Sequence, residues 1–126
     1  MTTSRSDIPR DVLRFMNALA DELGQDRDWW AKRAKRGRIN PQQRLIIMLV
    51  MLRWTGKFQR PAVDMHLALD LGRGTAMAIK NQMLTLLEFE PDIARACKTL
   101  EGYQAGRFIL EQYRVPINLC MGKLLT

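Results

Sequence analysis

Eight consecutive apolar residues, from Leu45 to Leu52, constrain the fold of this chain more than any other feature of its sequence. Asn40 and Pro41 stand just before them and predict a helix start. The Asn side chain can accept hydrogen bonds from the free N–H groups of a first turn, and Pro fits the first helical position. The expected helix spans about 41–55, although eight apolar residues also suit a buried strand. A helix that is apolar on every side belongs at the centre of a core, or one of its sides forms a dimer contact.

Gly and Pro residues divide the rest of the chain into segments with helical spacing of apolar residues. No pair of alternating runs is joined by Asn-Gly or Asp-Gly, so β-hairpins are not expected. The sequence therefore predicts an all-α fold of about six to seven short helices in a single helical domain, 1–126, with a frayed tail at 1–6. Besides the apolar one, the expected helices span about 8–23, 27–36, 61–71, 75–88, 92–101 and 103–114, and a short apolar tail follows Pro116.

Length and composition disfavour several classes of protein. An apolar run of eight residues is less than half of what a membrane-spanning helix requires. The first seven residues contain no apolar segment of the kind that a secretory signal needs. The two cysteines, Cys97 and Cys120, cannot build a disulfide framework. We therefore expect a cytoplasmic protein with no membrane partner.

Positive charge is concentrated in the first two thirds of the chain. Twenty Lys and Arg residues against 13 Asp and Glu residues give a formal net charge of +7, which favours a polyanionic partner such as nucleic acid. Residues 87–126 are balanced, with five basic and five acidic side chains. The densest basic segment follows Trp29 and Trp30. A solvated helix face and one inward Trp are the ordinary explanations for these residues, and phosphate contacts with base stacking are the functional ones. The basic residues of this segment are Arg27, Lys32, Arg33, Lys35, Arg36 and Arg38.

Two of the expected helices are joined by a very short turn, with the features of a helix-turn-helix. The small residue Ala68 stands where the two helices would cross, and Leu71 and Gly72 supply an apolar anchor followed by a glycine at the turn. Ile79 and Met83 can anchor the second helix from behind. The spacing therefore places a second, outward-facing helix directly after the turn.

Residues 61–88 resemble the core of MarR-like and related winged-helix regulators. The shared pattern is Leu-Ala-x-x-Leu-Gly, followed by a turn with Ser or Thr and a recognition helix. Residues 88–102 lack the Gly-rich, strand-forming wing of those proteins. The resemblance implies a transcriptional regulator that binds double-stranded DNA, with helix 75–88 in the major groove.

A helical wheel separates the residues of 75–88 into two sides. Ile79, Met83, Leu86 and Leu87 fall on one side, which we expect to be buried, whereas Gly74 and the residues around Asn81 fall on the other. Asn can pair with adenine, Met and Ala can contact a thymine methyl group, and Lys and Arg can reach phosphate or guanine. Ordinary exposed residues are the alternative, and Met77 with Leu84 can equally form a protein contact. The expected DNA-reading residues are Arg73, Thr75, Met77, Ala78, Lys80 and Asn81.

Basic residues around helix 41–55 and its exit extend this expected surface. Together with the basic segment near Trp30, they would contact phosphates and position the recognition helix without reading sequence. Arg44 belongs to this group. The residues expected to contact phosphate are Lys32, Lys35, Arg36, Arg38, Arg53, Lys57 and Arg60.

Catalysis and cofactor binding find little support. The sequence has no P-loop pattern, and Gly72 and Gly74 match only the first two glycines of a dinucleotide-binding pattern. The only histidine, His66, has no Cys or carboxylate at metal-ligand spacing, and Cys97 lies in an apolar helical setting that predicts a core residue. We expect no enzyme activity, no cofactor and no metal.

Two functions from different classes follow. The first is a nucleoid-associated, sequence-specific DNA-binding regulator, expected as a homodimer whose contact lies in the helical region 92–126. The second is a small helical protein-binding module, an inhibitor or adaptor, whose basic face binds an acidic partner protein. Eight methionines suit adaptable protein contacts as well as core filling. The apolar residues expected at the dimer contact are Ile117, Leu119, Met121, Leu124 and Leu125.

Overall fold

The computed structural model describes residues 8–27, 39–58, 69 and 71–120 of the chain. Within these residues it contains helices and no strand, which confirms the all-α class. Five helices are described, fewer than the six to seven expected, and the expected helices 27–36 and 61–71 lie for the most part outside the described residues. The five are α1 (Arg10–Glu22), α3 (Pro41–Phe58), α5 (Arg73–Phe89), α6 (Asp92–Thr99) and α7 (Gly102–Cys120).

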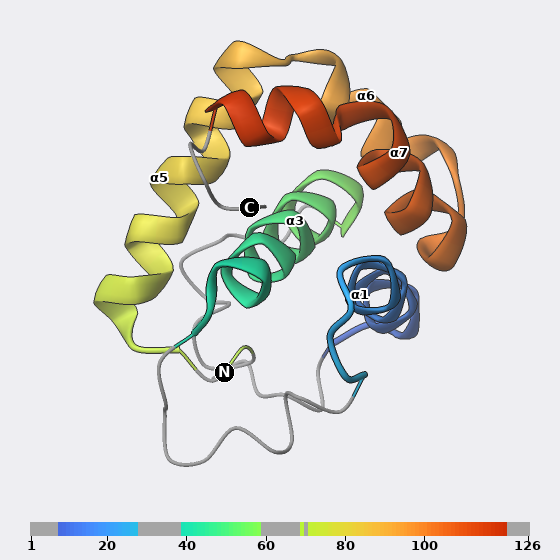
Figure 1. The fold of residues 1–126 in the computed structure, drawn as a ribbon, viewed down its shortest axis with the longest axis horizontal. Coiled ribbons are helices and arrows are strands. Elements are labelled where there is room, and N and C mark those ends of the chain that lie inside the picture. Colours follow the sequence, from blue (N-terminus) through green and yellow to red (C-terminus); the bar gives the residue numbers. More distant parts are fainter. Residues whose placement is uncertain (1–7, 28–38, 59–68, 70, 121–126) are drawn as a thin grey trace.

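The apolar helix α3 forms the centre of the molecule, with α1 on one side, α5 on the other and α6 and α7 around it (Figure 1). Residues 45–52 are at most 3% exposed, so the apolar run is buried within one copy of the chain. The start of α3 is a capping box: the Asn40 side chain accepts a hydrogen bond from the Gln43 N–H at 2.7 Å, and the Gln43 side chain accepts one from the Asn40 N–H at 3.2 Å. The expected helix start is confirmed, and the strand alternative is wrong.

A glycine in the left-handed conformation ends α1. Gly24 has φ 68°, and the N–H groups of Gly24 and Gln25 donate to the carbonyl oxygens of Asp21 and Ala20 at 3.3 and 2.8 Å. This pattern satisfies carbonyl groups that the end of a helix leaves free, and a residue with a Cβ is strained at this φ. The expected end of helix 8–23, directly before this glycine, is confirmed within one residue.

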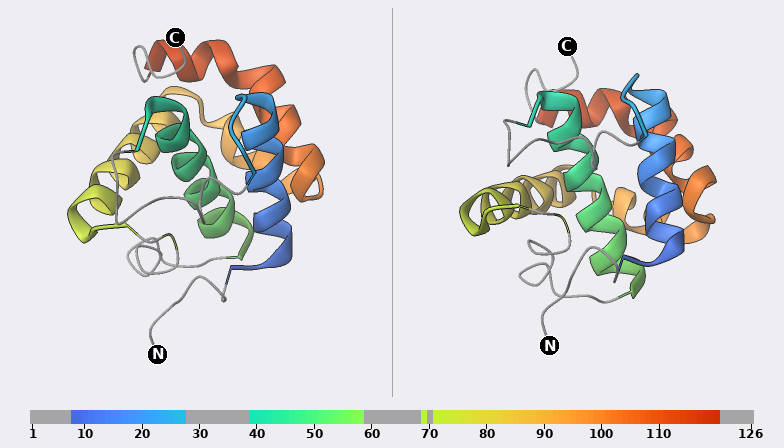
Figure 2. Two further views of the ribbon diagram at one scale, coloured as in Figure 1. Left: turned by 60° about the horizontal axis from the view of Figure 1, so that its bottom comes forward. Right: turned by 90° about the horizontal axis from the view of Figure 1, so that it is seen from below.

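Two glycines let α7 lie against α1 at very short range (Figure 2). A Cβ added at Gly102 would overlap the carbonyl oxygen of Asp11. A Cβ added at Gly106 would lie 2.8 Å from the Cβ of Ala18 and 2.9 Å from the carbonyl oxygen of Phe15. Glycines four residues apart share one face of a helix, so together they form the contact surface with α1.

Helix α7 does not end at residue 114 as expected, but continues through Pro116 to Cys120. Proline cannot donate the backbone hydrogen bond of its turn and its ring crowds the preceding turn, which bends a helix. The bend of α7 is visible in Figures 1 and 2. The second half stays packed because Ile117 is fully buried in the core. The assignment of Ile117 to a dimer contact is therefore wrong.

No helix in the described part of the chain combines the length and apolar character that crossing a membrane requires.

Candidate nucleic-acid interface

Helix α5 packs against the core with the side that the helical wheel predicts. Ala76, Ile79, Met83 and Leu86 are buried, and Leu87 is half-buried. Leu71, the expected apolar anchor before the helix, is also buried. These contacts fix which side of α5 faces outward.

The outward side of α5 presents the residues expected to read DNA. Five of the six are exposed, and Lys80 is half-buried on the flank. Gly72 precedes the helix in an extended conformation, with φ −64° and ψ 148°, and supplies no side-chain cap. Gly74, in the first turn, has open space around the position of an added Cβ. The N-terminal half of this side therefore combines the cation of Arg73 and the polar side chains of Thr75 and Asn81 with the apolar Met77 and Ala78, and it has little bulk near Gly74. The five exposed residues are Arg73, Thr75, Met77, Ala78 and Asn81.

The C-terminal half of the same side has a different character. Leu84 and Phe89 are exposed there, together with the carboxylate of Glu88. A carboxylate repels phosphate, so only the first half of α5 suits contact with a nucleic acid.

Arg44 ties the first turns of α3 to the middle of α5. Its Nε donates a hydrogen bond to Gln82 Oε1 at 2.7 Å, and both side chains are half-buried. Sequence analysis did not identify Gln82, although it lies next to Asn81 and about 100° around the helix from it. The partner of Gln82 is 38 residues away in sequence, so no local pattern indicates this contact.

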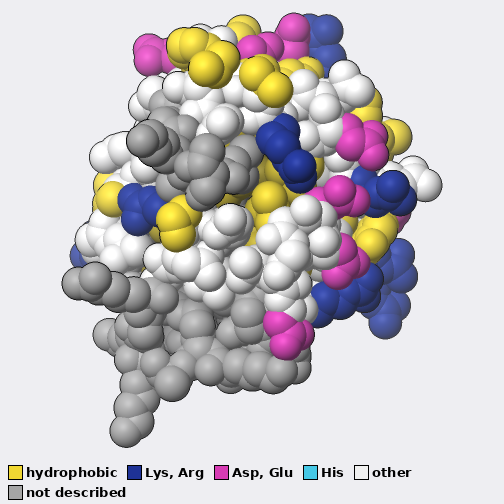
Figure 3. Space-filling model, viewed as in Figure 1, with side chains coloured by type: hydrophobic (Ala, Val, Ile, Leu, Met, Phe, Trp, Pro, Cys, Tyr) yellow, Lys and Arg dark blue, Asp and Glu magenta, His cyan; other side chains and the backbone are white. Residues whose placement is uncertain are grey.

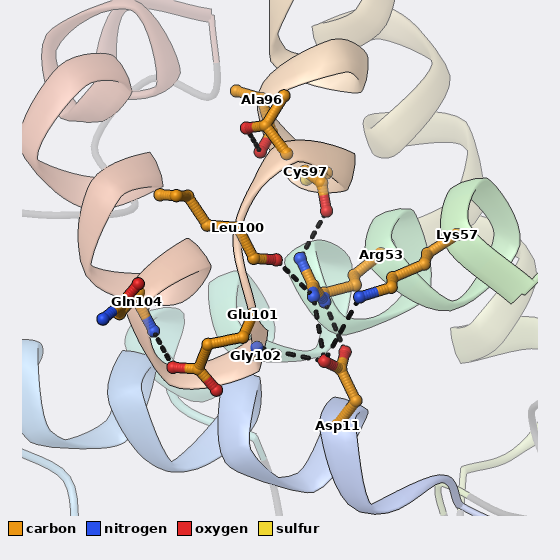
Figure 4. Close-up of polar contacts among 10 residues, drawn as sticks. Asp11, Arg53, Lys57, Ala96, Cys97, Leu100, Glu101, Gly102 and Gln104 are labelled. Carbon is orange, nitrogen blue, oxygen red and sulfur yellow. Dashed lines mark hydrogen bonds and ion pairs between the residues drawn. The ribbon is translucent and has the colours of Figure 1, made fainter.

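Arg53 does not face outward, and its assignment as a phosphate contact is wrong. Its side chain is 0% exposed. Figure 4 shows it enclosed between α1, α3, α6 and the start of α7. Nε and Nη2 donate to the two carboxylate oxygens of Asp11 at 2.8 and 3.1 Å, Nη2 also donates to the carbonyl oxygen of Leu100 at 2.8 Å, and Nη1 donates to that of Cys97. A side chain buried and hydrogen-bonded in this way cannot reach a ligand on the surface, so Arg53 has a structural role.

Asp11 is the acceptor that organises this cluster. Besides Arg53, it accepts hydrogen bonds from the Gly102 N–H at 3.0 Å and from Lys57 Nζ at 3.4 Å. Burial on its own raises the pKa of Asp11, but the hydrogen bonds and the charges of Arg53 and Lys57 outweigh burial and lower that pKa. Lys57, expected to contact phosphate, keeps about a third of its side chain exposed and lies beside α1 rather than beside the outward side of α5.

The basic segment 27–38 lies outside the described residues, except for Arg27 at its start. Arg27 forms two hydrogen bonds with Asp21, at 3.0 and 2.6 Å, and its guanidinium lies 5.7 Å from the centre of the Tyr103 ring. Figure 3 likewise shows basic and acidic side chains next to each other over α1 and α7. The expected residues outside the described ranges are Lys32, Lys35, Arg36, Arg38 and Arg60, along with Trp29, Trp30, His66 and Ala68.

Cys97 lies in the core, as its apolar setting predicts. It is 1% exposed, and burial raises its pKa to about 12, so the sulfur is a neutral thiol at physiological pH. Among the described residues, no three His, Cys, Asp or Glu side chains are placed to hold a metal ion. A shallow cleft of about 290 Å³ separates parts of α6 and α7, away from all the residues expected to contact DNA. Its lining residues are Asp92, Arg95, Ala96, Thr99, Phe108 and Tyr113.

Comparisons of this chain with protein-family models, with curated proteins and with solved structures found no match. The outward side of α5 and the residues beside it form the candidate site.

Proposed function

We propose that this protein is a sequence-specific DNA-binding regulator that places the N-terminal half of α5 in the major groove. One observation carries the proposal. The helix is held by four buried apolar residues, and this packing turns outward a half-face that mixes cationic, polar and small or apolar side chains, without a carboxylate from Arg73 to Gln82. A helix of 17 residues fits the groove, which admits an α-helix and presents a distinct pattern of donors and acceptors for each base pair.

The roles of the individual residues follow from their chemistry. Asn81 lies at the centre of the exposed side, where its amide can both donate to and accept from adenine. Met77 and Ala78, on either side of it, can contact thymine methyl groups. Arg73 and Lys80 share one flank and can reach phosphate or guanine. Gly74 leaves room for a close approach of the helix backbone to the DNA.

A fluorescence-anisotropy titration near 150 mM salt tests the proposal. It compares DNA from the region upstream of the protein's own coding sequence with a scrambled duplex of equal length. We expect a preference of about a hundredfold for the upstream DNA, which corresponds to roughly 2.7 kcal/mol. Binding that shows no preference and is lost at this salt concentration would contradict sequence-specific recognition.

Asn81→Ala tests the reading of bases separately from binding. This variant should lose on the order of 1–3 kcal/mol on the preferred duplex and much less on the scrambled one, because only the base contact is removed. Lys80→Gln should instead weaken binding to both duplexes and reduce the salt slope by about one. Equal losses on both duplexes for Asn81→Ala would remove Asn81 from the reading surface.

Exposed apolar side chains favour a second candidate, a helical module that binds a protein. Leu84 and Phe89 are exposed on α5, and Val115 and Leu119 are exposed on the second half of α7. Apolar side chains also gather at the top of the face in Figure 3, where α5 ends. Larger exposed apolar patches mark protein contacts in general. DNA binding without preference, lost near 150 mM salt, favours this candidate with an acidic partner protein.

Homodimerisation is part of the first proposal, and Leu119 is the one described exposed residue among those assigned to the contact. Met121, Leu124 and Leu125 lie outside the described residues. Sedimentation equilibrium at micromolar concentration should give twice the chain mass, and Leu119→Glu should shift it toward the monomer. A wild-type monomer at that concentration would contradict the dimer. A cytoplasmic, nucleoid-associated location follows from the proposed DNA binding and is tested by co-purification with chromosomal DNA.

A further inference from the structure

Three consecutive residues of α5 define the geometry of its exposed side. Lys80 and Gln82 lie about 100° to either side of Asn81, because successive residues of a helix are separated by that angle. Arg73 lies seven residues before Lys80 and Thr75 seven residues before Gln82, so each pair shares a flank. The exposed side therefore has a cationic flank, with Arg73 and Lys80, and a flank without its own cation, with Thr75 and Gln82.

Arg44 supplies the missing cation from α3. Its Nε donates to Gln82 Oε1 at 2.7 Å, which brings the guanidinium beside the second flank. Among the described residues, no carboxylate forms an ion pair with Arg44, although its side chain is half-buried. A half-buried cation that has no counter-charge in the described part of the chain favours an anion.

The hydrogen bond also determines what Gln82 can recognise. One lone pair of its oxygen accepts from Arg44, which leaves the amide N–H groups to donate to another group. A guanidinium likewise has donors and no acceptor. Together the charged guanidinium and the amide N–H groups of Gln82 present several donors, which match the acceptor oxygens of a phosphodiester.

We infer that Arg44 and Gln82 form a phosphate-binding pair that contacts the DNA backbone on the flank of α5 opposite Arg73 and Lys80. The inference rests on the proposed function. A helix of about 10–12 Å diameter fills a major groove about 12 Å wide, so a sugar-phosphate backbone runs along each of its flanks. Arg73 and Lys80 contact one backbone, the Arg44–Gln82 pair contacts the other, and Asn81 faces the bases between them.

The variant Gln82→Glu distinguishes phosphate binding by Arg44 and Gln82 from a hydrogen bond that only connects α3 to α5. The glutamate keeps an oxygen for Arg44 and strengthens that hydrogen bond by adding charge, so a structural tie is retained or improved. The same change neutralises Arg44 and places a carboxylate where a phosphate would bind. Gln112→Glu, on the exposed surface of α7, changes the net charge equally and serves as the matched control.

The measurements are dissociation constants for the preferred and scrambled duplexes between 50 and 300 mM salt, together with the urea midpoint of each variant. We expect Gln82→Glu to weaken binding to both duplexes about five- to tenfold relative to Gln112→Glu at 150 mM salt, with a salt slope reduced by about one. Its urea midpoint should equal or exceed that of wild type. Arg44→Gln should give the same reduction in slope, and Arg14→Gln, on α1, should not.

The outcomes separate the two proposals. If the wild-type protein prefers its upstream DNA but Gln82→Glu and Gln112→Glu bind with equal affinity and slope, the phosphate-binding pair is wrong and the proposed function stands. If the wild-type protein shows no preference for any duplex, the proposed function is wrong, and the inference that rests on it is wrong as well.

Discussion

Replacing Asp11 with Asn should lower the free energy of unfolding by about 3 kcal/mol, because it leaves the charge of Arg53 buried without a counter-charge. Asp11 provides both oxygens that the Arg53 Nε and Nη2 groups contact, at 2.8 and 3.1 Å. Asparagine keeps one of these acceptors and turns the other into an N–H group that faces the guanidinium. The carbonyl oxygens of Cys97 and Leu100 remain, but they carry no net charge.

The magnitude follows from the burial of the two partners. Removal of one partner from a buried ion pair costs about 3–5 kcal/mol when the other stays buried. Arg53 is fully buried, whereas the Asp11 side chain is 24% exposed, so water reaches the carboxylate side of the pair. Partial screening places the expected loss at the lower end of that range.

Asp21→Asn is the matched control for this variant. Like Asp11, Asp21 accepts hydrogen bonds from the Nε and Nη2 groups of one arginine, here Arg27, and it also accepts one from the Tyr103 hydroxyl at 2.7 Å. The Arg27 side chain is 56% exposed, so water can solvate it once its partner is lost. Urea denaturation at pH 7 should therefore show a clearly smaller loss for Asp21→Asn than for Asp11→Asn.

The pH dependence of the free energy of unfolding gives a second test of the Asp11–Arg53 ion pair. The pKa of Asp11 is lowered in the folded protein, so the unfolded chain binds the proton more tightly than the folded one. The stability that Asp11 contributes is complete above its ordinary pKa of 3.8 and is lost as the pH falls from there toward the folded value. The difference in free energy of unfolding between wild type and Asp11→Asn should therefore become smaller below about pH 4. A loss under about 1 kcal/mol at pH 7, or a gap independent of pH, would refute the idea that Arg53 depends on this carboxylate.

Three further predictions test the fold and the interface. Gly106→Ala should cost about 1–3 kcal/mol in urea denaturation, because its Cβ would lie 2.8 Å from that of Ala18, and unchanged stability would show that α1 and α7 separate easily. Gly74→Ala should stabilise the protein by about 0.5–1 kcal/mol, because the added Cβ meets open space in a helical turn. In an anisotropy titration the same variant should bind the preferred duplex more weakly, and an unchanged affinity would rule out close approach of DNA at Gly74. Cys97 should resist alkylation by iodoacetamide at pH 8 in the folded protein and react in urea, because burial raises its pKa to about 12. Rapid labelling of Cys97 in the folded protein, detected by peptide mapping, would contradict its position in the core.

Local signals in the sequence predicted much of the helical framework. The stop at Gly24 and the start at Asn40 depend on residues within one turn of the helix end, so a short stretch of sequence determines them. The two sides of α5 follow in the same way, since the spacing of Ile79, Met83 and Leu86 contains the information about which side is buried.

Contacts between distant residues could not be predicted in this way. A basic residue after an apolar run suggests a surface position, and Asp11, which allows Arg53 to be buried, lies 42 residues earlier in the chain. Pro116 signals the end of a helix locally, but burial of Ile117 holds the next turn against the core. The expected division near Gly102 is confirmed, since α6 ends at Thr99 and α7 begins at Gly102, but the close contact that Gly102 and Gly106 make with α1 depends on residues more than 80 positions away.

The contact between α1 and α7 also affects when the protein can fold during its synthesis. Gly102 donates to Asp11 across 91 residues of sequence, and Arg53 needs Asp11 together with carbonyl groups near the start of α7. At about 5–20 residues per second, a ribosome takes roughly 5–18 s to make that stretch. During this interval the apolar side of α1, with Phe15 and Leu19, cannot yet pack against α7, and chaperones bind exposed apolar segments of this kind. Helix α1, the first helix of the described fold to be synthesised, therefore packs against α7 only late in synthesis.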